Sequence, residues 1–186
     1  MDPRQELDET ACVDELSPRA GAGNRGTHRV TAALVMAAVI ALDQASKALA
    51  RGLLEDGRRI ALLGDVFRLE LARNAGAFLG LGAALAPGLR GAILTWGVLT
   101  LAAGAAWVAL LRPGHLGMAI GAALVAGGGF GNLWDRFTAG GLVTDFMNLG
   151  LGRLRTGIFN VADLAIVAGV ALLLLPHGPA DRRKAP

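Results

Sequence analysis

Two apolar segments without a single charged residue place the strongest constraint on what this chain can fold into. They cover residues 91–111 and residues 116–134. A helix needs about 20 apolar residues to cross the ~30 Å hydrocarbon core of a lipid bilayer, and each segment has about that length. The sequence therefore predicts a membrane protein rather than a water-soluble domain.

Two further segments are apolar but contain charged residues. Residues 30–50 have no charge as far as Leu42 and then include Asp43 and Lys47, whereas Asp163 is the one charged residue within 158–176. With these segments counted as spans, we expect a membrane all-α fold with four transmembrane helices, in a domain over residues 29–178. An even number of spans places both termini on the same side of the membrane.

The connections between these segments differ in length. Residues 112–115 predict a tight turn, whereas residues 58–72 alternate apolar and polar side chains after a turn at Gly64 and Asp65. Such alternation predicts an amphipathic β-hairpin. The Gly-rich residues 140–157 predict a loop with short strands. Both long connections fall on the side opposite the termini, so we expect a small β-structured region there.

Charge and composition exclude a nucleic-acid partner. Only 18% of residues are charged, and the net charge is +3. The basic residues lie singly at the ends of apolar segments, as membrane-flanking residues do, and no basic stripe with interleaved aromatics is present. Residues 1–28, polar and mixed in charge, predict a disordered extension. Residues 179–186 form a basic tail, and its cluster at 182–184 favours cytoplasmic termini, although the two sides carry similar numbers of basic residues.

Acidic residues within or beside the apolar segments are the candidate seat of chemistry. A charge at the bilayer centre costs at least about 2.5–3.5 kcal/mol, so such residues face a protein interior or a wet cavity. The predicted topology brings several acids, amides and cations to the membrane face opposite the termini. They are Asp43, Asp135, Asp145, Asp163, Asn74, Asn132, Asn160, Lys47 and Arg136. Because buried amides need partners, we expect one hydrogen-bonded network.

The residue types on that face narrow the chemistry. None of the three His residues lies there, and Cys12 belongs to the N-terminal extension, so we expect no metal ion and no Ser-His-Asp triad. Ser46 and Lys47 are adjacent and point about 100° apart on a helix, which argues against a Ser–Lys dyad. Two carboxylates that share a proton suit cofactor-free hydrolysis. The same acids would also suit a proton-coupled transporter or channel, and a catalytically idle scaffold is a third hypothesis.

Five sequence elements resemble those of a known family, and they occur in the family's order. They are DQASK at 43–47, NAGAF at 74–78, GGFGNLWDR at 128–136, VTDF at 143–146 and FNVAD at 159–163. The family is that of the lipoprotein signal peptidases, or signal peptidase II, which are bacterial intramembrane aspartic proteases. The resemblance extends over residues 30–176.

The resemblance implies an aspartic endopeptidase with a catalytic dyad of Asp145 and Asp163 and without a cofactor. It implies removal of the signal peptide from diacylglyceryl-modified prolipoproteins, by cleavage just before the lipidated Cys. It also implies a multi-pass protein of the bacterial inner membrane, with cytoplasmic termini and an active site near the periplasmic face under a β-structured cradle. We expect a monomer whose partners are these substrates and membrane lipid.

Eight further residues match positions that line or brace the family's site. They are Asn74, Gly76, Asn132, Asp135, Arg136, Asn160, Asp43 and Lys47. Arg136 and Asn74 are candidates for gripping polar parts of the substrate. The sequence departs from the family pattern at Phe78, which comes one residue early so that Leu79 fills its slot, at Thr144 and at Leu164. We expect these departures to affect substrate fit rather than catalytic groups.

Overall fold

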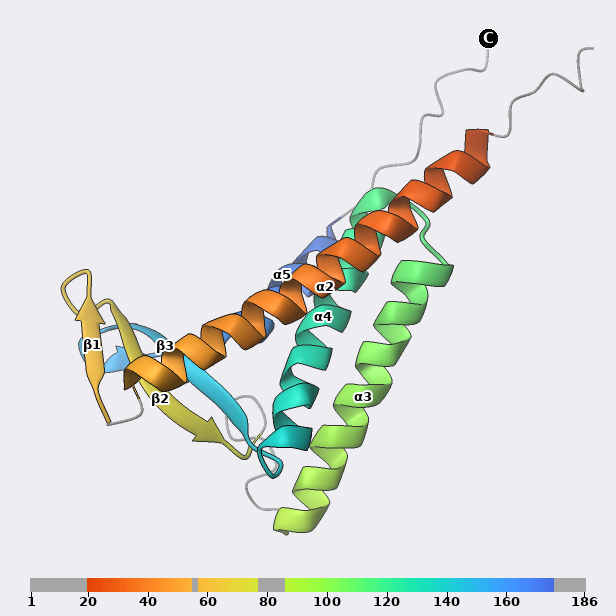
Figure 1. The fold of residues 1–186 in the computed structure, drawn as a ribbon. Coiled ribbons are helices and arrows are strands. Elements are labelled where there is room, and N and C mark those ends of the chain that lie inside the picture. Colours follow the sequence, from red (N-terminus) through yellow and green to blue (C-terminus); the bar gives the residue numbers. More distant parts are fainter. Residues whose placement is uncertain (1–19, 55–56, 77–85, 176–186) are drawn as a thin grey trace, which may run out of the picture.

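A helical bundle with a small sheet at one end makes up the computed structural model, which describes residues 20–54, 57–76 and 86–175 (Figure 1). Within these ranges the elements follow one another in a simple order. They are α2 (Ala20–Leu54), β1 (Arg59–Leu62), β2 (Phe67–Asn74), α3 (Pro87–Leu111), α4 (Leu116–Thr138), β3 (Val143–Leu151), β4 (Leu154–Arg155) and α5 (Val161–Leu174).

The four predicted apolar helices form, but their lengths differ from the prediction. Three contain stretches long and apolar enough to cross a membrane, namely Asn24–Leu54, Gly91–Leu111 and Leu116–Thr138. Helix α5 has 14 residues, so it is about 21 Å long at 1.5 Å per residue. This length is below the ~30 Å of a hydrocarbon core. The helix is also shorter than the apolar segment 158–176 from which it was predicted.

The first helix is longer than its apolar segment. Helix α2 begins at Ala20 and has 35 residues, so residues 20–28 are helical where the sequence predicted a disordered extension. Once a helix is nucleated, each added residue gains one backbone hydrogen bond, so a helix can propagate beyond its apolar part. Residues 1–19 and the predicted basic tail at 179–186 lie outside the described residues.

Helix α4 lies at the centre of the bundle, between α2, α3 and α5 (Figure 1). Its buried face consists of small residues, among them Ala119, Ala122, Ala123 and Ala126. A Cβ atom added to Gly128 would lie 2.4 Å from the backbone oxygen of Ala162 in α5. Only glycine permits such a close approach, which brings the middle of α4 against the beginning of α5.

The predicted hairpin is confirmed as strands β1 and β2, and the loop after α4 contains β3 and β4. The sheet is antiparallel in the order β1-β2-β3-β4. In the β2–β3 register, Ala72 pairs with Asp145 and Asn74 with Val143. Leu69 and Leu71 of β2 pack against a cluster formed by Ala50, Leu54 and Phe146. This packing fixes the sheet to the end of α2 and positions β3 beside the helices.

Candidate active site

The two predicted catalytic carboxylates come from different elements. Asp145 lies in β3 and is 2% exposed. Asp163 lies in the first turn of α5, where it forms a capping box with Asn160. The backbone N–H of Asp163 donates to the Asn160 side chain at 2.9 Å, and the backbone N–H of Asn160 donates to Asp163 Oδ2 at 3.1 Å. Such reciprocal bonds satisfy the free N–H groups of a helix start and hold the Asp163 side chain in place.

Two asparagine side chains connect these carboxylates. Asn160 Nδ2 donates to Asp145 Oδ1 at 2.6 Å and also to Asn132 Oδ1 at 3.0 Å. Asn132 Nδ2 in turn donates to Asp163 Oδ1 at 2.9 Å. These four residues therefore form part of the network expected from the sequence, and it links the two acids through buried amides.

Asn74 and Gly76 bring the end of β2 into the site. Asn74 Nδ2 donates to Asp145 Oδ2 at 2.9 Å, while its Oδ1 accepts the backbone N–H of Gly76 at 2.8 Å. Both ends of the Asn74 amide are thus engaged within the protein, which favours a positioning role over contact with a substrate. Phe78 and Leu79, whose spacing departs from the family pattern, lie outside the described residues.

A buried ion cluster lies beside the two predicted catalytic carboxylates. Lys47 Nζ lies 2.8 Å from Asp43 Oδ2 and 3.3 Å from Asp135 Oδ2. The two carboxylates are themselves fixed by backbone donors. Asp43 Oδ1 accepts the N–H of Ala162 at 2.9 Å, and Asp135 Oδ2 accepts that of Thr144 at 2.8 Å. Because Ala162 precedes Asp163 and Thr144 precedes Asp145, the cluster anchors the backbone beside both predicted catalytic residues.

Gln44 belongs to this cluster, although sequence reasoning did not select it as a site residue. Its Nε2 lies 3.1 Å from three acceptors, which are Asp43 Oδ2, Asp135 Oδ1 and the backbone oxygen of Gly131. The sequence could have identified Gln44, because a polar amide inside an apolar segment needs hydrogen-bond partners.

The site raises the pKa of Asp145 to about 6 from an ordinary 3.8. Burial of the carboxyl is the main cause, because removal from water disfavours the charged form. The hydrogen bond from Asn74 opposes this shift, and the neighbouring charge of Asp163 adds to it. A carboxyl that keeps its proton to such a pH is suited to acid–base chemistry near neutrality.

Arg136 has an unused hydrogen-bonding group near the dyad. Its Nη1 is buried and has no hydrogen-bond partner among the described residues. The guanidinium interacts electrostatically with Asp163 and Asp145 and, to a lesser extent, with Asp135. It forms no ion pair with Asp135 within the described part of the chain, so the cation remains available at the edge of the site.

The two other departures from the family pattern, Thr144 and Leu164, lie among the described residues. The hydroxyl of Thr144 accepts a hydrogen bond from Arg51 Nη1 at 3.1 Å, so this side chain has a polar partner that valine would lack. Leu164 is 50% exposed and therefore does not enter the buried network. Within residues 20–54, 57–76 and 86–175, no group of three or more His, Cys, Asp or Glu residues is arranged to hold a metal ion.

Comparisons with known proteins show what the chain is similar to. The family described as signal peptidase (SPase) II matches residues 35–177. The lipoprotein signal peptidase of Rhodococcus jostii is 36% identical over 151 residues, which cover 76% of this chain and 69% of the relative. That of Gloeobacter violaceus is 40% identical over 138 residues, which cover 73% of this chain and 75% of the relative.

A solved structure shares the fold. It is described as a "bacterial membrane enzyme structure by the in meso method at 2.3 A resolution". Its TM-score is 0.69 at 22% sequence identity, and the likeness covers 84% of this chain and 94% of that one. The arrangement of helices and sheet is therefore one that a bacterial membrane enzyme adopts.

Proposed function

This chain belongs to the signal peptidase II family of bacterial membrane proteases, and from that premise we propose that it is an aspartic endopeptidase acting on diacylglyceryl-modified prolipoproteins. It removes the signal peptide by cleaving just before the lipidated Cys. The observation that carries this proposal is the link between Asp145 and Asp163 through the side chains of Asn132 and Asn160.

The chemistry follows from a pair of carboxyls that share one proton. The ionised carboxylate takes a proton from water as the water oxygen bonds to the scissile carbonyl carbon. The protonated carboxyl then donates its proton to the departing amide nitrogen, and the C–N bond breaks. The proton taken from water restores the dyad, so that no cofactor is consumed. The neighbouring charge of Asp163 contributes to the raised pKa of Asp145, and that raised pKa favours the protonated form of Asp145.

We assign the surrounding residues to separate tasks. Asn74, Asn132 and Asn160 position the carboxyls, since their amide groups are engaged with the dyad. Arg136 contacts the substrate, because its unpartnered Nη1 offers a donor to a carbonyl or ester oxygen. Lys47, Asp43 and Asp135 brace the site.

We further propose a multi-pass arrangement in the bacterial cytoplasmic membrane, with cytoplasmic termini and the dyad near the periplasmic face. Helix α5 is then the fourth span. Its short length fits a start at the dyad, below the membrane surface. Apolar side chains on the sheet support its contact with lipid at the outer boundary, since Leu63, Leu151 and Leu154 are 80%, 73% and 85% exposed.

Cleavage of a lipidated precursor by the purified protein tests the proposal. We expect a shortened product with the wild-type chain and none with Asp145→Asn or Asp163→Asn, while both variants still insert in membranes. Glu70→Gln is the matched control, because Glu70 pairs on the hairpin with Arg59, which is 58% exposed, and ion pairs open to solvent contribute little stability.

Two outcomes would contradict the proposal. Full activity in either Asp variant would show that Asp145 and Asp163 are not the catalytic pair. Substrate-dependent proton flux in liposomes, without any cleavage, would instead support a transporter.

A further inference from the structure

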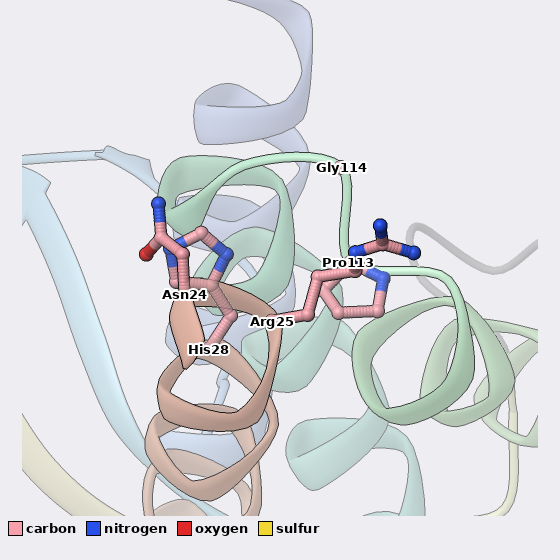
Figure 2. A pocket seen from close by; sticks show the side chains of 5 residues that line it. All are labelled: Asn24, Arg25, His28, Pro113 and Gly114. Carbon is pink, nitrogen blue, oxygen red and sulfur yellow. The ribbon is translucent and has the colours of Figure 1, made fainter. Parts of the chain in front are cut away.

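A cavity lies at the end of the bundle opposite the dyad. It has a volume of about 380 Å³ and is lined by Asn24, Arg25, His28, Pro113 and Gly114 (Figure 2). Its lining comes from the beginning of α2 and from the turn between α3 and α4. Leu116, two residues after Gly114, and Asp135 are on the same helix and therefore about 28 Å apart along its axis. The cavity is thus separate from the candidate active site.

The cavity is large enough for a chemical group rather than a single water molecule. One water occupies about 30 Å³ of liquid, and pockets for small ligands begin at about 300 Å³. Asn24 and Arg25 are exposed at its rim, whereas His28 is 8% exposed. The lining therefore passes from solvent-accessible polar side chains to a buried one.

His28 has an unsatisfied polar atom in this cavity. Its Nδ1 is buried and has no hydrogen-bond partner in the part of the chain that the structure describes. Figure 2 shows the imidazole beside the Asn24 side chain, and the Arg25 side chain on the other side of it, next to Pro113. Buried polar atoms nearly always have a partner, so this nitrogen indicates a ligand.

The other surroundings of the cavity favour an anion. Arg25 contributes a guanidinium group. Helix α4, which has 23 residues, begins at Leu116 immediately beyond the turn. The first N–H groups of a helix lack partners within it, and its N-terminus carries a partial positive charge, which together favour phosphate groups. His115 occupies one of these N–H groups, that of Met118, at 3.0 Å.

The position of the cavity at the ends of the apolar helices favours a lipid headgroup as the anion. The apolar parts of α2, α3 and α4 end around it, at Asn24, Leu111 and Leu116 respectively. Arg112, beside the turn, lies 5.1 Å from the ring centroid of Trp107. Trp and basic residues at the end of a membrane span lie at the level of the lipid headgroups.

We propose that this cavity binds the phosphate group of a membrane phospholipid on the face opposite the dyad. His28 Nδ1 and the Arg25 guanidinium hold its oxygen atoms, and the start of α4 adds a favourable field. Asn24, Arg25 and His28 precede residue 35, at which the family match begins, so most of the polar lining lies outside the matched region. The proposal does not depend on the proposed protease activity.

Lipid titration of the full-length, delipidated protein in detergent tests the proposal. Binding is followed by native mass spectrometry and by the thermal unfolding midpoint. The probes are phosphatidylglycerol, a diacylglycerol with the same acyl chains, and inorganic phosphate. We expect phosphatidylglycerol to bind and raise the midpoint, and diacylglycerol, which lacks the phosphate, to do neither.

Two variants and one control locate the binding. His28→Phe keeps a buried ring and removes both nitrogens, whereas Arg25→Gln alters the rim and remains informative if His28→Phe fails to fold. We expect each to weaken phosphatidylglycerol binding at least fivefold. Arg153→Gln removes an exposed arginine after β3 and leaves binding unchanged.

The other possible outcomes either support or overturn phosphate binding in this cavity. Binding of inorganic phosphate that is lost in His28→Phe, without lipid binding, supports the phosphate site and assigns it to a soluble anion. Equal phosphatidylglycerol binding by the wild type and both variants, equal binding of diacylglycerol, or an equal loss in Arg153→Gln would overturn the proposal.

Discussion

The ammonium group of Lys47 donates to Asn132 Oδ1 at 3.0 Å, so a fully buried cation sets the direction of an amide in the dyad network. The Asn132 oxygen faces Lys47, and its Nδ2 therefore faces Asp163. If the amide were rotated by 180°, its oxygen would face the Asp163 carboxylate and the hydrogen bond would be lost. Lys47 thus acts on the dyad through Asn132 without contact with the reacting atoms.

Replacement of Lys47 by Met tests this coupling. The change leaves Asp43 and Asp135 buried without their cation, and loss of one partner of a buried ion pair costs about 3–5 kcal/mol. We expect a large drop in the unfolding midpoint and a fall in kcat. The double variant Asp43→Asn/Lys47→Met removes one of the uncompensated charges, so it should recover part of the stability. A double variant no more stable than Lys47→Met would contradict the ion-cluster interpretation.

Asn160 has two tasks that substitutions can separate. Its Oδ1 caps α5 and its Nδ2 donates to Asp145. Asn160→Ser keeps a capping oxygen but lacks the amide donor, so we expect some loss of stability from the unsatisfied buried acceptors and a kcat about 10–100-fold lower, as when a group that orients a catalytic side chain is lost. Asn160→Ala also loses the cap and should unfold about 1 kcal/mol more easily. Wild-type kcat in Asn160→Ser would show that the link between the carboxyls is not needed.

The sequence predicted the residues of this site more fully than their connections. The spacing of Asp43 and Lys47 is that of neighbours on one helix face, so their ion pair was readable from the chain. The contacts of Asn132 with Lys47 and Asp163 depend on how α2, α4 and α5 rotate and pack against one another. No local pattern encodes that rotation.

A similar distinction holds for the fold. Alternating side chains predicted the β1–β2 hairpin, but the pairing of β2 with β3 joins segments separated by α3 and α4. The length of α5 was misjudged because hydropathy counts Ile158 and Phe159 as part of the apolar segment. The capping box of Asn160 and Asp163 instead starts the helix at Val161.

The raised pKa of Asp145 predicts a pH dependence of stability. A carboxyl whose pKa is about 6 in the folded state and 3.8 when unfolded binds its proton more tightly in the folded protein. The contribution of Asp145 to the free energy of unfolding should therefore be largest below pH 4, decrease between pH 4 and 6, and stay low above pH 6. A difference of about two pKa units corresponds to about 3 kcal/mol.

Asp145→Asn isolates this contribution. Asparagine keeps the shape of the side chain and does not titrate, so the decrease between pH 4 and 6 should disappear from the unfolding free energy of the variant. The measurement is chemical unfolding in detergent at fixed pH values, with Glu70→Gln as the reference. An unchanged pH profile in Asp145→Asn would mean that another group causes the dependence.

Helices α4 and α5 approach each other closely at Gly128. In Gly128→Ala the new Cβ would lie 2.4 Å from the Ala162 oxygen and 2.7 Å from Ile166 Cγ1, so the helices must separate. Overpacking of this kind costs about 1–3 kcal/mol. Because Ala162 directly precedes Asp163, the separation should also lengthen the bond from Asn132 to Asp163 and lower kcat.

Gly104→Ala in α3 is the matched control for this prediction. A Cβ added at Gly104 meets no atom within 4 Å, and alanine is a better helix former than glycine by about 1 kcal/mol. We therefore expect Gly104→Ala to raise the unfolding midpoint slightly and to leave kcat unchanged. If Gly128→Ala matched Gly104→Ala in both the unfolding midpoint and kcat, close packing of α4 on α5 would not be what holds Asp163 in position.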